Sequence, residues 1–542
     1  MAKKNIGISN KVLEVDLSSR TWNVFEVSRE ERKLYIGAKG LGLKLLFDRI
    51  NPGIDPLSEK NILSIVPGIL TDAKGGCSGW FYSVAKSPLT NLFNSSFCNG
   101  SFGVQLRTAG WDGLIIKGRS RKHIILKIDK NGAYFEDGEA IWGFSTKKSQ
   151  EKLVKGKNEA ALVIGPAGEN GVKFANIRSG NSFFGKEGLG AVMGSKNLKG
   201  VVVKGGDYKI LPANKKKLNK LRKKANKYTN QNQAGSYLFK SFKPESSSDL
   251  GEIFSEIFTK RKPYKVSSED KKSLIELGAA SVIGTNLKTS DSSITAKFNE
   301  ICSKMGMDTI LAGRTIGWIM GSSEKCGLDF QVKTESYKGI EDFLYEIAYS
   351  RGEGVKAGLG LEELLRQYNQ EDFTTKMKIR EMDAFMNEAL PDSQIDFHDL
   401  NSGSFSFSFY EIAIDSFFRL LKIDNLRSQP GFIKLFENVF CAVNSLGICC
   451  FTSYFYARNP VLLKYCPKLT LNIFVKRFPA LAISLVNFSL YSKLFTALTG
   501  IKLSRKDFLK AGERIHKLEK NMNIREYSLG KKDVLKGRGS QI

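Results

Sequence analysis

Four glycine-rich segments in the first 200 residues have the residue types and spacing to bind an anion. Glycine lets backbone N–H groups approach closely, and a nest of such amides can hold phosphate. None has the spacing of a dinucleotide-binding loop, and Gly194-Ser195-Lys196 lacks the Gly-Lys-Ser/Thr order of a Walker loop. Tight turns in a β-rich domain are the alternative, and composition alone favours them. The segments are residues 35–42, 75–79, 98–103 and 185–196.

The elements that must position these loops change type along the chain. Residues 12–17 and 22–27 alternate apolar and polar side chains around a Ser-Ser-Arg turn, which predicts a hairpin. Further strands are expected at 114–118, 124–128, 161–164 and 200–203, with a short helix at 42–48. Beyond Lys215 apolar residues recur every three or four positions, which predicts helices at 290–302, 309–320, 340–349 and 361–368.

This change of period predicts an α+β fold with three domains. The first is a β-rich N-terminal domain at residues 1–207. It is followed by a helical middle domain at 208–400 and a helical C-terminal domain at 401–542.

Composition restricts the class of protein. Hydrophobic residues make up 42% of the 542 positions, which excludes a disordered chain. No uninterrupted apolar run of about 18 residues is present, and the first residues lack an apolar segment. Eight cysteines without regular spacing argue against a disulfide framework. We therefore expect a cytoplasmic protein that does not bind a membrane.

The net charge of +28 raises nucleic-acid binding as an alternative. Nucleic-acid binders interleave positive charge with aromatic side chains. The densest basic stretch runs from Lys215 to Lys227 and has no aromatic residue before Tyr228. Leu218 and Leu221 give it the spacing of a solvated helix, so we predict no nucleic-acid partner.

Five longer motifs carry a resemblance to a known family. They are Ile36-Gly37-Ala38-Lys39-Gly40-Leu41, the Ala-Lys-Ser-Pro-Leu-Thr at 85–90, the segment 107–116, the Gly-Pro-Ala-Gly-Glu-Asn at 165–170, and the segment 188–199. Together they resemble the aldehyde ferredoxin oxidoreductase family over essentially all of residues 10–205. The fold expected from the resemblance is that family's β-rich N-terminal domain followed by mainly helical domains.

The resemblance implies a tungsten or molybdenum ion held by two pterins, with a magnesium ion bridging their phosphates. It places Asn99 and the loop at 180–190 beside those phosphates. It also implies a small aldehyde-like substrate and a ferredoxin or other electron-transfer partner subunit, and it leaves a homodimer open. The residues expected to bind the cofactor in the first 200 positions are Lys39, Gly40, Ser78, Asn99, Gly100, Gly185, Gly188 and Gly190.

Two downstream segments resemble the family's pterin-contacting segments. In Cys302-Ser-Lys-Met-Gly-Met-Asp308 the resemblance assigns Asp308 to the pterin ring, and an ordinary helix N-cap is the alternative. In Asn444-Ser-Leu-Gly-Ile-Cys449, Asn444 replaces the family's aspartate and keeps an acceptor without the charge. Within the first domain, Trp80 stands where the family commonly has Arg or Lys, and Phe183-Phe184 stands in a loop of small residues.

The residues for electron export and acid–base chemistry are incomplete. No cysteine lies between Cys98 and Cys302, where the family supplies three ligands of an iron–sulfur cluster. Cys449 is the remnant of the fourth metal-ligand position, so we predict that the cluster is absent. Glu276 is the catalytic candidate, since the family's second glutamate is Gly278 here. His398 is expected to be a surface residue. The remaining cysteines Cys302, Cys326, Cys441, Cys450 and Cys466 are expected to be buried structural thiols.

Two functions follow from this reading. The first is an oxidoreductase that acts on an aldehyde or related oxo group at a tungsten or molybdenum bispterin. The second is a non-catalytic paralogue that binds the pterin cofactor or an active partner subunit. In either case we expect the glycine loops to converge on one pocket, with Lys39, Lys74 and Lys186 near it.

Overall fold

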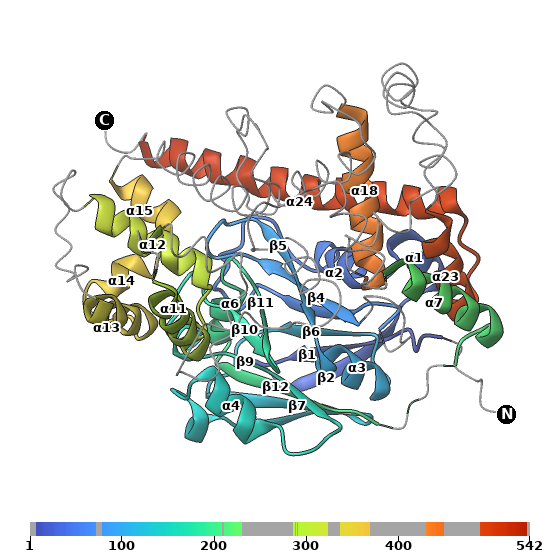
Figure 1. Cartoon of the computed structure of the whole chain (residues 1–542), viewed down its shortest axis with the longest axis horizontal. Helices are drawn as coiled ribbons and strands as arrows, with labels where there is room; N and C mark the ends of the chain where they lie inside the picture. Colours follow the sequence, from blue (N-terminus) through green and yellow to red (C-terminus); the bar gives the residue numbers. More distant parts are fainter. Residues whose placement is uncertain are drawn as a thin grey trace.

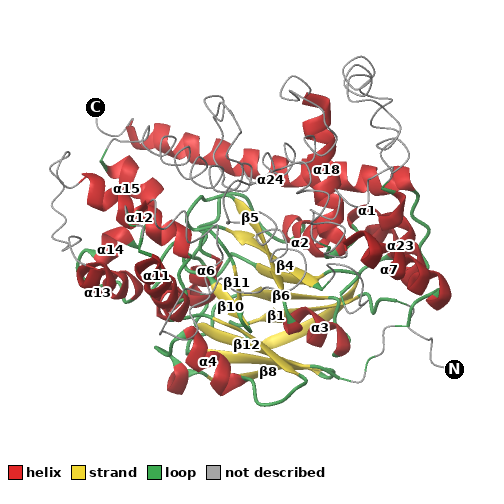
Figure 2. Cartoon of the chain, in the orientation of Figure 1, coloured by secondary structure: helices red, strands yellow, loops and turns green. Residues whose placement is uncertain are grey.

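Two six-stranded sheets form the centre of the molecule, and helices flank them (Figures 1 and 2). The computed structural model describes residues 7–71, 79–206, 208, 211–229, 286–287, 289, 291–322, 337–368, 430–448 and 488–538. All twelve strands fall before residue 205, and the elements described after it are helices. This arrangement confirms the predicted α+β fold.

The first sheet has the strand order β2-β1-β6-β3-β4-β5. β1 pairs with β6 in parallel, and the other neighbouring strands are antiparallel. β5 is therefore an edge strand that runs beside β4 alone. The strands are β1 (Lys11–Asp16), β2 (Thr21–Glu26), β3 (Leu63–Pro67), β4 (Trp80–Lys86), β5 (Phe93–Asn99) and β6 (Gly113–Lys117).

The second sheet has the order β11-β10-β9-β12-β7-β8. Here β12 pairs with β7 in parallel, and the other pairs are antiparallel. The strands are β7 (Ile124–Asp129), β8 (Gly132–Asp137), β9 (Glu159–Val163), β10 (Ile177–Ser179), β11 (Ser182–Phe184) and β12 (Leu198–Lys204).

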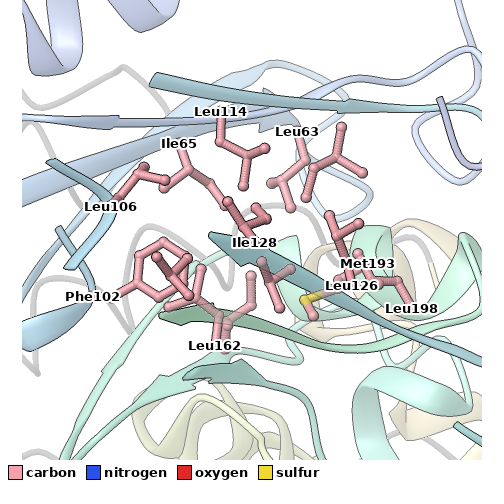
Figure 3. Packing of buried hydrophobic residues seen from close by; sticks show 14 of the residues in the cluster. Leu63, Ile65, Phe102, Leu106, Leu114, Leu126, Ile128, Leu162, Met193 and Leu198 are labelled. Carbon is pink, nitrogen blue, oxygen red and sulfur yellow. The ribbon is translucent and has the colours of Figure 1, made fainter. Parts of the chain in front are cut away.

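A continuous apolar layer fills the space between the sheets (Figure 3). It forms because side chains alternate between the two faces of each strand. Burying each aliphatic side chain contributes roughly 1.5–3 kcal/mol relative to exposure. The first sheet supplies Leu63, Ile65 and Leu114, the second supplies Leu126, Ile128 and Leu162, and α3 (Ser101–Thr108) adds Phe102 and Leu106.

Helices from both ends of the chain cover the outer face of the first sheet (Figure 1). α2 packs on β3 and β4, and α24 packs on α1, α2, α18 and β5. Leu41 of α2, Cys441 of α18 and Ile515 of α24 share one apolar cluster with Val66 and Val84 of the sheet. The helices are α1 (Arg29–Tyr35), α2 (Ala38–Phe47), α18 (Pro430–Leu446) and α24 (Arg505–Arg538).

A second helical group packs beside α5 and α6 and around Val172 and Phe174. Its bounds are α11 (Ser292–Met305), α12 (Thr309–Ser322), α13 (Tyr337–Ala348), α14 (Gly354–Ala357) and α15 (Leu361–Gln367). The remaining helical elements are η1 (Glu139–Ile141), α4 (Thr146–Leu153), α5 (Pro166–Glu169), α6 (Leu189–Ser195), α7 (Lys215–Thr229) and α23 (Ser489–Thr499).

Several predicted elements are confirmed, and others were missed. The hairpin, the strands β6, β7, β9 and β12, and the helices α11, α12, α13 and α15 lie where the sequence predicts them. β3, β4 and β5 were not predicted. β4 is almost wholly buried and β5 carries four polar side chains, so neither alternates as a half-buried strand does. In α7 the lysines at 215–217 are exposed, while Leu218 and Ala225 are buried.

Charged side chains are buried as pairs at several points. Lys86 Nζ lies 2.7 Å from Glu526 Oε2, and Arg32 Nη2 lies 2.9 Å from Asp112 Oδ2.

Lys196 and Lys199 belong to one of the motifs of the resemblance, and both have structural roles here. Lys196 Nζ donates to the carbonyl oxygens of Asn61 and Gly118, while Lys199 pairs with Glu169. Burial lowers the pKa of Lys196 to about 7.

None of the helices within the described residues is long and apolar enough to cross a membrane.

The Lys86–Glu526 pair predicts a large stability effect. Lys86→Met removes the closer of the two cations beside the buried Glu526 and leaves Arg525 at 3.4 Å, so the free energy of unfolding should fall by about 3–5 kcal/mol. Lys127→Met is the matched control, because its pair with Glu136 is exposed and should contribute less than about 1 kcal/mol. Urea denaturation followed by circular dichroism measures both. Equal losses in the two variants would contradict the structural role of Lys86.

Candidate functional site

β5 links the glycine segments that the sequence singles out. The hydroxyl of Ser96, on this strand, accepts a hydrogen bond from Gly185 N at 2.8 Å. Asn94 donates to the carbonyl oxygen of Lys186 and to Glu187 Oε2, at 2.7 and 2.9 Å. Asn99 ends the strand, and Gly100 follows it at the start of α3. The segments at 98–103 and 185–190 therefore meet along one strand.

The third glycine segment reaches the same strand through α24. Lys39, in the first turn of α2, is buried and lies 2.7 Å from Glu519 Oε2. The other oxygen of Glu519 accepts from the hydroxyl of Ser95 on β5 at 3.1 Å. This ion pair already neutralises the charge of Lys39, which was predicted to face phosphates.

The C-terminal end of α18 closes this corner. Gly40 N donates to Ser445 Oγ at 2.9 Å, and Trp80 N donates to the carbonyl oxygen of Gly447 at 3.4 Å. Asn444 is buried at 3% exposure beside these residues in sequence. Gly40 and Asn444, predicted from separate parts of the chain, therefore belong to neighbouring segments.

At most of these positions glycine is required because neighbouring segments pack too closely for a side chain. A side chain at Gly40 would collide with Tyr35 O and Ile515, and one at Gly190 with the backbone of Ala175 and Asn176. Gly188, at φ 93°, lies against Lys173 O. At these positions glycine permits contact between protein segments, as the turn alternative proposed.

Other glycines have space where a side chain would lie, and they are found near the start of β4 and the end of β5. A Cβ at Gly79 would meet only Asn99 Oδ1 at 3.4 Å, and one at Gly100 only Ser179 at 3.7 Å or beyond. Gly180, in the β10–β11 turn, has no neighbouring atom within 4 Å of its Cβ position. Among the residues that the structure describes, this group, which we call the open glycine group, has few or no neighbouring atoms where a side chain would lie.

Asp308 caps a helix. Its Oδ1 accepts from the backbone N–H groups of Ile310 and Leu311, both at 3.0 Å, at the start of α12. Its own N–H donates to Phe174 O, and Ala175 forms a β-bridge with Met307. The cap that the sequence analysis left as an alternative is present, and the pterin contact of Asp308 stays a prediction.

Glu187, in the loop before α6, is a carboxyl group with a strongly raised pKa. It has a φ of 64°, which is uncommon for a side chain with a Cβ, and its carbonyl oxygen accepts from Ser87 Oγ. Burial, with help from the negative charges of Glu362 and Asp308, raises the pKa of Glu187 to about 7. Lys186, which precedes it, is exposed. The sequence analysis missed Glu187, and a glutamate inside a glycine loop was the available signal.

The remaining candidates are separate from this region or outside the described residues. Cys302 and Cys441 are buried as predicted, and burial raises the pKa of the Cys302 thiol. Within the part of the chain that the structure describes, no three His, Cys, Asp or Glu side chains are grouped to hold a metal ion. The residues outside it are Lys74, Ser78, Glu276, Cys326, His398, Cys449, Cys450 and Cys466.

Comparison with known proteins decides the family. A model described as aldehyde ferredoxin oxidoreductase, N-terminal domain, matches residues 12–205, and one for domains 2 and 3 of the same enzyme matches residues 256–540. This chain belongs to the aldehyde ferredoxin oxidoreductase family. The sequence analysis had inferred this family from its motifs, and the matches confirm it.

Members of the family are similar over nearly the whole chain. Tungsten-containing aldehyde ferredoxin oxidoreductases of Pyrococcus furiosus and Thermococcus kodakarensis are each 26% identical, covering 95% of this chain and 88% of the relative. An aliphatic sulfonate oxidoreductase, WOR-like subunit, of P. furiosus is 33% identical over 36% of this chain and 34% of its own length.

A solved structure shares the fold. The active-site complex BamBC of benzoyl coenzyme A reductase, solved with 1,5-dienoyl-CoA, superposes with a TM-score of 0.71. The match has 19% identity and covers 96% of this chain and 89% of the other.

The residues fit one part of the implied bispterin cofactor better than the other. The open glycine group and the amide of Asn99 offer space and hydrogen-bond partners to a flat polar ring system. Among the described residues the phosphate end fits less well, because Lys39 is paired with Glu519 and Trp80 stands where the resemblance leads us to expect a cation. Phe183 and Phe184 are structural, since Phe183 lies beside Arg178 and Phe184 packs edge-on against Phe81.

The raised pKa of Glu187 predicts a pH-dependent loss of stability. Below pH 4.5 its carboxyl is protonated in both the folded and unfolded chain. As pH rises toward 7 the unfolded chain ionises first, so the fold loses on the order of 3 kcal/mol.

Glu187→Gln should remove this loss, because the amide stays neutral and still accepts from Asn94. Urea midpoints of wild type and variant at pH 4.5 and pH 8 give the comparison. The same decline in both proteins would show that Glu187 ionises normally.

The cap at Asp308 predicts a second effect on stability. Asp308→Ala should lower the free energy of unfolding by about 1 kcal/mol, whereas Asp308→Asn should cost less because asparagine is an equally good cap. Asn removes the charge but keeps an oxygen, so pterin content in this variant reports the ligand role separately. An alanine variant as stable as wild type would argue against the cap.

Proposed function

We propose that this chain is an oxidoreductase acting on an aldehyde or related oxo group, with a tungsten or molybdenum bispterin as its cofactor. The observation that carries the proposal is the match of both family models, which together span residues 12–205 and 256–540. When bound, such a cofactor supplies the two-electron chemistry. The protein then has to bind the flat cofactor, orient the substrate and exclude water.

The described residues support cofactor binding at the corner between α2, α18, β4 and β5. We assign the ring contacts to Asn99, Asp308 and Asn444, and the close backbone approaches to the glycines of the same corner. Glu276 is proposed as the catalytic carboxyl group that moves a proton on the substrate. The full proposed set is Lys39, Gly40, Ser78, Asn99, Gly100, Gly185, Gly188, Gly190, Asp308 and Asn444.

We further propose that a magnesium ion accompanies the phosphates and that no four-cysteine iron–sulfur cluster is present. Serine, aspartate and glutamate oxygens suit such a cluster poorly, and no cysteine lies between Cys98 and Cys302. Electrons would then leave through a partner subunit that carries its own redox centre. Cytoplasmic location and the domain limits at 207 and 400 are part of the same proposal.

The missing cysteines favour a second candidate. A non-catalytic paralogue would hold the pterin cofactor, or bind an active subunit, without turnover. Bound pterin in a protein that never reduces a dye would identify it.

Analysis of anaerobically purified protein tests both candidates. We expect tungsten or molybdenum together with pterin, and no iron or acid-labile sulfide at the stoichiometry of a cubane. Aldehyde-dependent reduction of a viologen dye distinguishes the enzyme from the paralogue. Iron and sulfide with a reducible cluster signal in low-temperature EPR would overturn the predicted absence of the cluster. Protein devoid of metal and pterin would overturn the cofactor assignment.

A further inference from the structure

Three aromatic rings lie together where β4 and β5 pair. Phe97 on β5 is directly opposite Tyr82 on β4, with ring centroids 5.6 Å apart. The ring of Trp80 lies diagonally across, 4.5 Å from that of Phe97. Alternation along β5 puts Phe97 on the same side as Ser95 and Asn99.

This side of β5 is covered for only part of its length. α24 contacts the first half, where Phe93 N donates to Asn523 and Ser95 donates to Glu519. Phe97 comes next and is 45% exposed, while Trp80 is half-buried and Tyr82 is buried. The ring of Phe97 is thus exposed beyond the part of β5 that α24, among the described helices, contacts.

The surroundings of Phe97 suit a flat ring better than an anion. Trp80 pairs directly with Asn99, and Gly79 and Gly100 of the open glycine group adjoin these two residues. Lys39, which Glu519 of α24 connects to the same side of the strand, is paired with that carboxylate, and Ser95 binds it as well. Arg178 donates to Gly180 O, within the open glycine group, and to Thr146 Oγ1 of α4, so part of its hydrogen-bonding capacity is already used.

We infer that Phe97 and Trp80 form a stacking platform for a planar heteroaromatic ring, with the Asn99 amide available to the ring's polar edge. This part of the corner therefore contacts its ligand through the face of a ring. Aromatic faces attract rings in offset or tilted contact, and such stacking is tolerant of ring type. The inference rests on the proposed function only in naming a pterin as that ring.

The test uses the full chain produced in a host that cannot make the pterin cofactor. Titration with 6-carboxypterin, followed by the anisotropy of its own fluorescence, measures ring binding directly. Phe97→Ala should weaken binding by roughly ten-fold, whereas Phe97→Tyr keeps a ring and should bind as wild type does. Phe47→Ala is the matched control, because Phe47 is 44% exposed but lies at the end of α2.

Competition with pyrophosphate separates the ring platform from a phosphate site. Pyrophosphate at comparable concentration should not displace the probe. Displacement by pyrophosphate, no binding of the probe to wild type, or equal binding by Phe97→Ala would each overturn the inference. Circular dichroism and melting temperature confirm that each variant is folded.

A second measurement uses protein from a pterin-producing host. Phe97→Ala should then carry several-fold less extractable pterin than Phe97→Tyr or Phe47→Ala. If wild type carries no pterin there, the proposed function fails, while the probe titration still decides the inference.

Discussion

Buried charge at the contact between α24 and the first sheet holds the molecule's distant segments in place. Lys86 and Glu526 are both almost fully buried, so removing either side chain would leave the other without its closest charged partner. About two helical turns earlier, Glu519 binds Lys39 and Ser95 at once. Because α24 also packs on α18, this attachment sets the position of Ser445 against Gly40. The first and last parts of the chain therefore build one corner together.

The same corner shows two different uses of glycine. Gly40, Gly188 and Gly190 let protein backbones approach each other, so any side chain there would separate packed segments. Gly79, Gly100 and Gly180 leave space instead. A glycine-rich sequence motif thus combines structural positions with a few that can face a ligand, and spacing alone does not separate them.

Phe184 and Trp80, which depart from the family pattern, have different roles in the structure. Phe184 fills the core against Phe81, so it is a packing change. Trp80 is different, because its ring lies against that of the exposed Phe97, where we propose an aromatic contact in place of the cationic one expected from the resemblance. A relative with the same fold can therefore anchor its ligand by another interaction, since fold does not fix the chemistry of a site.

The sequence by itself determined the fold class, the family and the lack of cysteine between positions 98 and 302, because each is written in local spacing or in residue counts. It also predicted a common set of cofactor-binding residues that includes Gly40, Asn99, Gly190 and Asp308. Tertiary structure decided which of them are packed against other segments and which have space beside them. It paired Lys39 with Glu519, 480 positions away, turned Asp308 into a helix cap and left Phe97 exposed. Ion pairing and burial depend on which segments contact each other in the folded protein. The periodicity of residues along the chain does not predict those contacts.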